Sequence, residues 1–419
     1  MTELFTAAEK HLKARHRAES RFRWAGRLAI VFSLGFLVIM LVSITLMGKG
    51  ALSRTEIGLQ IDLGLEAVDP ENLDKVRYKK LVRNALFATF SEVKDRSDRR
   101  SLLGFTSPDA QYELERQIRA TPSLLGSVQT IWLTASDNID LYMKGEIDVT
   151  LPEDQRRLKD NELAWLAKLE AAGQIRQVFN TAFFTSGDSR EPELAGILSA
   201  LIGSVFSLAV CFALSFPLGI MAAIYLQEFA KKGRWSDFIE VNINNLAAVP
   251  SIVFGLLGLS IFLGTFGLPR SSPLVGGMVL ALMTLPTIII ASRAALRSVP
   301  GSIREAALGM GATKVQTTFH HVLPLALPGM LTGAIVGMAR ALGETAPLIM
   351  IGMVAFIVDV PRGLTDAATS LPVQVFLWAD SPERGFLEKT SAAIMVLLGL
   401  LIVMNLVAIV LRRKFERRF

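Results

Sequence analysis

The chain has 419 residues, of which 51% are hydrophobic and 20% are charged, and its formal net charge is +6. The mean hydropathy of +0.42 and the gathering of the apolar residues in long blocks exclude an ordinary soluble domain as the whole of the protein. Cys211 is the only cysteine, which excludes an intrachain disulfide and a cysteine-rich metal site. We therefore expect an integral membrane protein.

Six apolar blocks are predicted to cross the membrane, because about 20 residues of apolar helix span about 30 Å of hydrocarbon. The blocks cover residues 28–47, 196–226, 238–264, 274–292, 328–357 and 390–411. Membrane helices tolerate proline, so the helices are expected to be kinked but continuous at Pro217, Pro250 and Pro286. The predicted fold class is an all-α integral membrane protein with about six transmembrane helices.

The first block follows a strongly basic leader, residues 1–27, and two interpretations compete for it. A signal peptide has an apolar region of about 7–15 residues and a cleavage site of small residues. The apolar run at residues 28–47 is longer, and residues 48–50 form a poor cleavage site. We therefore expect an uncleaved membrane anchor.

Lysine and arginine in the short loops predict the orientation, because cytoplasmic loops are enriched in these residues. With six spans, four basic segments fall on the same side of the membrane. They are the leader, the loop with Lys231, Lys232 and Arg234, the loop 293–327, and the tail 412–419. Both termini and the 293–327 loop are therefore expected in the cytoplasm.

Residues 48–193 form a long, charged and mostly polar insert between the first two spans, and the orientation places it outside the cytoplasm. A helix is predicted within residues 153–171, with apolar side chains near one face at Leu158, Leu163, Trp165, Leu166 and Leu169. We find no metal-ligand cluster, nucleophile motif or phosphate loop in the insert. A mainly helical docking or spacer domain is expected.

The polar segment REAALGMGATKVQTTFHHVLP, residues 304–324, lies between two apolar blocks, and a helix is expected over most of it. Ser302 and Glu305 have the spacing of a capping box at its start. Gly311 permits a bend or close packing midway. The helix is expected to end before the fifth span at two prolines, Pro324 and Pro328.

This segment resembles the cytoplasmic coupling loop of ABC-type importer permeases, through which a membrane subunit receives mechanical work from a separate ATPase. We refer to residues 293–327 as the EAA loop. The residues that carry the resemblance, and that it assigns to ATPase coupling, are Glu305, Ala306, Ala307, Gly311, Leu323 and Pro324. An ordinary amphipathic connector between two spans is the alternative interpretation.

The EAA loop departs from the family pattern at His321, where an aliphatic residue is usual. His320 stands beside it, and a metal or pH-sensing role for the two is an alternative. Neighbouring residues on a helix point about 100° apart, however, so the two imidazoles would not chelate an ion together. Surface histidines at a partner interface are expected.

The fifth block contains two charged residues, Arg340 and Glu344, four positions apart. Charges inside hydrocarbon are costly and are candidates for function. In one interpretation the pair neutralises itself and ties helices together. In the other, Arg340 faces the translocation path and offers its planar donors to an oxyanion, while Glu344 keeps binding weak enough for release.

Three further motifs resemble the PstA-type permease of phosphate-specific ABC importers: RALGETAPL in the fifth block, AAVPSIVFGLLGL at 247–259 and FFTSGDSREPELAGI at 183–197. The resemblance implies a type I importer fold over residues 194–411 in a bacterial inner membrane. It implies a second, homologous permease subunit, two ATP-binding subunits and an extracytoplasmic phosphate-binding protein, with phosphate as solute, lipid as surroundings and no nucleic acid. Arg340 and Glu344 are the charged pair that it associates with transport. The insert and Ala248 depart from the family pattern.

Several alternatives remain open. A permease for sulfate or molybdate would also suit Arg340, and the insert 48–193 could be the ligand domain of a membrane sensor. An ion-coupled secondary transporter would leave the EAA loop unexplained. The sequence lacks the G-x4-G-K-[ST] loop of ATPases, so we expect a non-catalytic subunit that binds no metal or cofactor, with ATP used by its partner.

Overall fold

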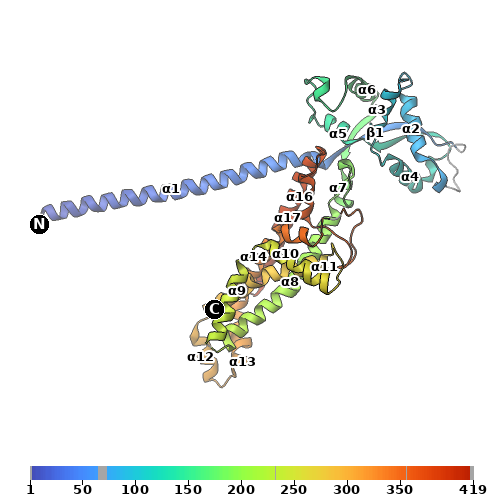
Figure 1. Ribbon diagram of the computed structural model, residues 1–419. Helices are drawn as coiled ribbons and strands as arrows, with labels where there is room; N and C mark the ends of the chain where they lie inside the picture. Colours follow the sequence, from blue (N-terminus) through green and yellow to red (C-terminus); the bar gives the residue numbers. More distant parts are fainter. Residues whose placement is uncertain (1, 65–72, 232, 355, 416–419) are drawn as a thin grey trace.

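A long N-terminal helix, an insert with a small β-sheet and a bundle of apolar helices follow one another along the chain (Figure 1). The computed structural model describes residues 2–64, 73–231, 233–354 and 356–415. Lys232 and the last part of the basic tail, residues 416–419, therefore lie outside the described residues.

Helix α1, Thr2–Gly48, contains both the predicted leader and the first predicted span, so these form one continuous helix. The helix runs away from the bundle (Figure 1), and its apolar stretch is exposed to the surroundings. Its last turn packs against the last helix of the chain, where Gly48 lies beside Ala392. Lipid or a partner subunit is needed to cover so large an apolar surface.

The insert is built around a three-stranded antiparallel sheet, which the sequence analysis did not predict. The strand order is β2-β1-β3, with β1 (Ser53–Asp62) between β2 (Val128–Thr134) and β3 (Ile175–Phe179). Helices still form the larger part of the insert, at α2 (Tyr78–Thr89), α3 (Arg96–Leu103), α4 (Ala110–Ala120), α5 (Asp137–Met143), α6 (Asp160–Ala171) and α7 (Thr181–Thr185).

The insert has a hydrophobic core of its own, as an independently folding domain requires. Alternate residues of β1 are fully buried at Ile57, Leu59 and Ile61. Three aromatic rings meet in this core, Phe90, Phe105 and Trp165, with centroids 6.0–6.2 Å apart. Trp165, Leu166 and Leu169 of α6 are buried as their periodicity predicted, although the helix begins later than expected, at Asp160.

The chain enters and leaves the insert at one place. The entry segment ends at Leu52, whose carbonyl accepts a hydrogen bond from the backbone N–H of Asn180 at 2.8 Å, just after β3. The Asn180 amide also donates to the carbonyl of Ala51 at 3.0 Å. Asn180 is 1% exposed, so this junction is a buried, fully hydrogen-bonded point.

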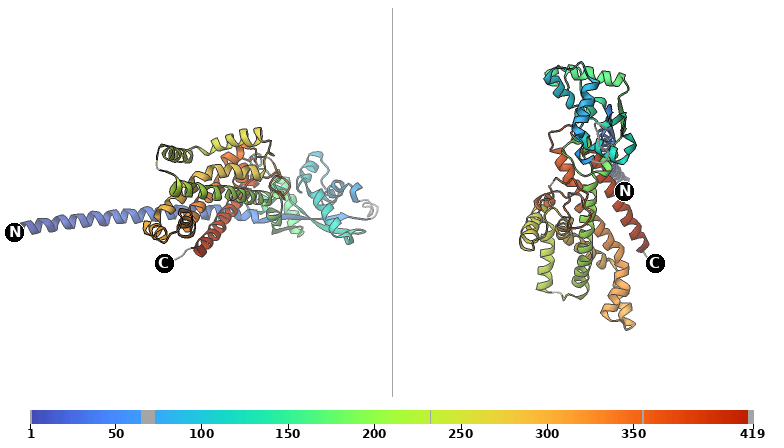
Figure 2. Two further views of the ribbon diagram at one scale, coloured as in Figure 1. Left: turned by 90° about the horizontal axis from the view of Figure 1, so that it is seen from below. Right: turned by 90° about the vertical axis from the view of Figure 1, so that its right-hand side faces the viewer.

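In the described part of the chain, five helices are long and apolar enough to cross a membrane, or six if one bent pair counts as a span, which confirms the predicted class. After α1, these spans are α8 (Leu198–Ile224), α11 (Pro273–Ser298), α14 (Leu323–Gly343) and α17 (Gly385–Phe415). The short helix α16, Leu371–Ala379, precedes α17. The insert and the EAA loop lie at opposite ends of the bundle (Figure 2).

The third predicted span, 238–264, is not one kinked helix. It consists of α9 (Arg234–Ala247) and α10 (Ser251–Gly258), which continues as a π-helical segment to Thr265, and the two parts meet at 99°. Pro250 explains the break, because it lacks the N–H that would continue the helix and disfavours helical backbone at Val249. Pro217 and Pro286, in contrast, lie inside the continuous helices α8 and α11.

Close helix contacts in the bundle depend on glycine, as is usual in membranes. A Cβ at Gly277 of α11 would overlap Val210 of α8, and one at Gly333 of α14 would overlap Ala291 of α11. Helix α8 therefore packs against α11, and α11 against α14, with the backbones in close contact.

Candidate functional site

Between the end of α11 and the start of α14, the EAA loop contains two separate helices rather than the single helix expected over most of residues 304–324. Helix α12, Gly301–Gly309, is followed by a turn and by α13, Lys314–Gln316. Gly311 ends α12 with φ +89, and the N–H groups of Gly311 and Ala312 donate to the carbonyls of Leu308 and Ala307. This is the Schellman arrangement, in which the left-handed position favours glycine.

The start of α12 also differs from the prediction. Its N-cap is Pro300, without a side-chain hydrogen bond, so Ser302 lies inside the helix and forms no capping box with Glu305. A capping box is present one helix later, where the Thr313 hydroxyl accepts from the Gln316 N–H and the Gln316 side chain accepts from the Thr313 N–H. In the EAA loop, the capping box therefore stabilises the start of α13 and not the start of α12.

The prolines at the end of the EAA loop do not stop the helix. A π-helical segment, Thr317–Val322, leads directly into α14, so Leu323, Pro324 and Pro328 lie within the helical span. A proline ring in a regular helix collides with the carbonyl four residues earlier. The wider π turn directly before Pro324 relieves this collision.

The side chains of the EAA loop divide into an exposed and a buried set. Glu305, Ala306 and Gly311 are exposed, whereas Ala307 is only 2% exposed and packs inside the chain. The sequence analysis missed four large apolar side chains that are exposed on the same loop: Leu308, Met310, Val315 and Phe319. The signal was available, since apolar residues in an otherwise polar loop mark an interaction surface.

His320 and His321 both lie in the π-helical segment, and both are exposed. The expectation that they are surface residues is therefore met in the isolated chain. Their role stays a prediction.

The charged pair of the fifth span lies at the end of α14. Arg340 is in the last turn, where a cation is favoured by the helix dipole, and Glu344 is the C-cap residue. Their side chains form an ion pair with 3.6 Å between Nε of Arg340 and Oε1 of Glu344. The Arg340 side chain is 53% exposed and the Glu344 side chain 20%, so the guanidinium is accessible while its partner is mostly covered.

The fifth span ends at Gly343, not at residue 357 as predicted. The backbone is extended at Glu344, and a separate short helix, α15 (Ala346–Met350), follows. Pro347 accounts for the break, because it has no N–H to donate to the carbonyl of Gly343. Non-helical backbone at membrane depth is tolerated where it is buried in protein or lines a water-filled cavity, and here it adjoins the accessible Arg340.

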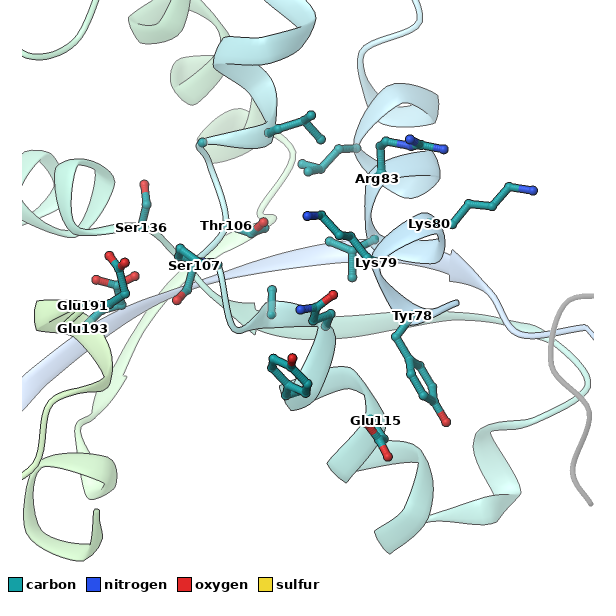
Figure 3. A pocket seen from close by; sticks show the side chains of 18 of the residues that line it. Tyr78, Lys79, Lys80, Arg83, Thr106, Ser107, Glu115, Ser136, Glu191 and Glu193 are labelled. Carbon is teal, nitrogen blue, oxygen red and sulfur yellow. The ribbon is translucent and has the colours of Figure 1, made fainter. Parts of the chain in front are cut away.

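A cavity of about 1050 Å³ lies where the insert meets the membrane part (Figure 3). Basic side chains line it at Lys79, Lys80 and Arg83 of α2, and acidic ones at Glu115, Glu191 and Glu193. Burial raises the pKa of Glu193 to about 7, with the Ser107 hydroxyl opposing the rise. With Arg77, Asp74, Asp137 and Glu383, the lining carries more acidic than basic side chains, which does not favour an anion.

Comparison with known proteins finds matches in two parts of the chain. Residues 215–419 match the family described as "Binding-protein-dependent transport system inner membrane component", and residues 9–153 match a domain of unknown function, DUF3333. The chain is 35% identical over 262 residues to "Phosphate transport system permease protein PstA 1" of Mycobacterium tuberculosis, covering 61% of this chain and 84% of that protein. The chain belongs to the PstA permease family.

A second relative is the PstA permease of Haemophilus influenzae, 30% identical over 199 residues, covering 48% of this chain and 69% of that protein. Among solved structures, the inward-facing MetNI methionine ABC transporter is similar at a TM-score of 0.40 and 17% identity, covering 53% of this chain and 95% of that one. A TM-score this low supports no inference. The PstA family resemblance read from the sequence is confirmed by the relatives, and PstA proteins are multi-pass inner-membrane permeases, a typically non-catalytic class.

The region that matches DUF3333 ends at residue 153, but the folded insert continues beyond this residue. Leu158 and Trp165 belong to the same hydrophobic core as β1, and β3 completes the sheet. The structural insert of this PstA-family chain therefore extends to the end of β3 at Phe179.

Proposed function

We propose that the chain is one of two transmembrane subunits of an ATP-driven importer that carries inorganic phosphate into the cytoplasm. Membership of the PstA family supports the permease role. One structural observation carries the mechanism: the EAA loop is a folded, exposed projection with a defined apolar surface, at the opposite end of the bundle from the insert.

The EAA loop docks into a groove of a separate ATP-binding subunit. Leu308, Met310 and Val315 supply apolar contacts, because such side chains gain most when they leave water. Glu305 and Ala306 lie exposed on α12 beside them. Two ATP-binding subunits serve the complex, and they rather than this chain hydrolyse ATP.

The remaining partners are a second, homologous permease and an extracytoplasmic phosphate-binding protein. The apolar stretch of α1, which the described chain leaves exposed, faces lipid and the second permease. The basic loops support an orientation with both termini in the cytoplasm and the insert outside. The binding protein then delivers phosphate at the end of the bundle that carries the insert.

Arg340 is the residue that we assign to the solute. Its guanidinium offers parallel N–H donors to an oxyanion, and it is accessible at a break in the span. Glu344 offsets the arginine charge, so phosphate is held weakly enough to be released. Sulfate or molybdate would meet the same donors, so only the family favours phosphate over them.

Purification of the intact complex tests this proposal. Mass analysis should find a second permease and two copies of an ATP-binding subunit, and liposomes containing the complex and its binding protein should accumulate labelled phosphate only with ATP. Excess sulfate or molybdate should compete weakly. Equal competition by the three anions would overturn the phosphate assignment, and uptake without any ATPase would overturn the coupling.

A further inference from the structure

Both legs of the EAA loop are attached to one short segment, the π-helical turn Tyr225–Phe229 that ends α8. From α12, Arg304 forms an ion pair with Glu228 in that turn. From α13, the ammonium group of Lys314 lies over the ring of Phe229, 5.6 Å from its centroid. Each leg of the loop thus has its own contact with neighbouring residues of the same turn.

Arg304 joins three elements with one guanidinium group. Its Nη2 and Nε donate to the two carboxylate oxygens of Glu228 at 2.8 and 3.3 Å. Its Nη1 and Nη2 also donate to the carbonyls of Val299 and Leu296 at 2.8 Å, at the C-terminal end of α11, where the Leu296 carbonyl also accepts from the N–H of Val299. One side chain of α12 therefore holds the ends of both α8 and α11.

The geometry of this contact requires arginine. The guanidinium makes four hydrogen bonds here from donors held in one plane, whereas a lysine ammonium has three donors on a single nitrogen and cannot reproduce all four. The Glu228 side chain is 9% exposed and the Arg304 side chain 23%, so water screens the pair poorly. The contact is rigid and largely shielded.

The neighbouring residue Arg297 provides a contrast. Its Nε donates to Gln227 of the same π turn at 2.9 Å, but its side chain is 57% exposed and lies 3.8 Å from Glu240. It touches the same turn from α11 without contacting α12. Arg297 is therefore a matched arginine outside the attachment of the EAA loop.

We propose that Arg304 and Glu228 are positioning residues that fix the EAA loop to α8 and α11, so that a displacement of the loop by the ATPase moves these helices. The inference rests on the proposed function, since it needs an ATPase that moves the loop. Beyond the turn, backbone-distance packing joins α8 to α11 and α11 to α14, which carries Arg340. The loop is already continuous with α14, so without the attachment a displacement of the loop would move α14 while α8 no longer followed it.

The test uses the complete complex in liposomes and compares Arg304→Lys with the matched control Arg297→Lys. Phosphate uptake and ATP hydrolysis are measured in the same preparation. Arg304→Lys should keep ATP hydrolysis within about twofold of wild type and lower phosphate moved per ATP at least tenfold, while Arg297→Lys should leave that ratio unchanged. A wild-type ratio in an assembled Arg304→Lys complex would overturn the proposal.

A double-mutant cycle with Glu228→Gln separates positioning from folding. Both single changes remove the same contact, so the double variant should lose no more coupling than the worse single variant, whereas independent effects would multiply. Multiplying losses would contradict the proposal. If Arg304→Lys assembles poorly, Glu228→Gln alone still tests the contact, because the glutamine keeps an acceptor oxygen and removes only the charge.

Spin labels supply a readout that does not depend on the solute. Labels at Ser302 and Tyr225, both exposed, report the distance between α12 and the π turn, and the single native cysteine, Cys211, is fully buried. The distance distribution should stay narrow with and without ATP in wild type and Arg297→Lys, and broaden in Arg304→Lys. An unchanged distribution in Arg304→Lys would overturn the inference even if phosphate proved to be the wrong solute.

Discussion

Lys144 of the insert donates a hydrogen bond to Glu388 in the first turn of α17, with 2.9 Å between Nζ and Oε2. It also donates to Asp140 at 2.5 Å, and Asp140 in turn accepts from the backbone N–H of Thr55 on β1. Burial alone would lower the pKa of Lys144. The carboxylates of Asp140 and Glu388 have the larger combined effect, so the pKa of Lys144 is raised. A shielded ionic contact thus fixes the insert to the bundle.

Replacing Lys144 by methionine should loosen the insert. The change leaves the carboxylates of Asp140 and Glu388 buried without a cation, and breaking such a pair costs about 3–5 kcal/mol. Limited proteolysis should cut the insert of Lys144→Met sooner, and its unfolding temperature should fall. The control is Lys168→Met, since both side chains of the Lys168–Glu92 pair are about half exposed and exposed ion pairs add little to stability. Equal losses in both variants would contradict the assigned role of Lys144.

The stability of the folded protein should fall as the pH rises from about 5 to about 7. In the folded protein, burial raises the pKa of Glu193 from 4.5 to about 7, so in this window the folded state holds a proton that the unfolded state has released. Asp137 acts in the same direction, because burial raises its pKa to about 6. The rise in the pKa of Glu193 corresponds to roughly 3 kcal/mol of folding free energy that is lost across this pH range.

Unfolding temperatures across this pH range check the prediction. Glu193→Gln cannot ionise and should show a flatter dependence on pH than wild type. Glu170→Gln, a change at an exposed carboxylate of α6, should keep the wild-type slope. The assignment fails if Glu193→Gln retains the full slope.

Gly311→Ala should weaken binding of the ATP-binding subunits. Alanine at φ +89 costs about 1–2 kcal/mol, so the turn of the EAA loop would relax to another shape and lose its fit to the partner. Each 1.4 kcal/mol lost should raise the Kd about tenfold. Gly309→Ala is the matched control: it lies inside α12, a Cβ there meets nothing within 4 Å, and alanine favours helix. Similar Kd values for both variants would show that the turn does not matter.

Arg340→Gln should reduce phosphate uptake by about 10- to 150-fold, because a charge-assisted hydrogen bond is worth about 1.5–3 kcal/mol. Arg340→Lys should lie between this variant and wild type, since it keeps the charge and loses the planar donors. Initial uptake rates in liposomes give the measurement. Arg413→Gln removes an exposed arginine from α17 and should have no effect. Normal uptake by Arg340→Gln would remove it from the solute path.

The spans and the location of the EAA loop could be predicted from the sequence because each depends on local composition. The bend after α9 could not be predicted, because Pro250 indicates a break in the helix but not the angle of 99° between its two parts. The sheet left a signal that was not used, the alternation of Ile57, Leu59 and Ile61, but its partner strands are far along the chain.

The contacts that fix the EAA loop were beyond sequence reasoning for a different reason. Arg304 and Glu228 are 76 residues apart, and no local sequence pattern around either residue indicates the other as its partner. The same holds for the exposed Met310, whose apolar character is visible in the sequence while its 78% exposure is not. Local patterns identify the functional segments, and the fold decides which side chains of a segment touch the chain and which face a partner.

The hydrogen bonds between Asn180 and residues 51 and 52 hold the two ends of the insert at one point. Because the chain returns to the place from which it departed, a change of loop length within the insert leaves the spacing of α1 and α8 unchanged. The insert remains tied to α17 through Lys144 and Glu388. Its exposed loops can therefore vary in length while this contact and the helices beneath it keep their positions.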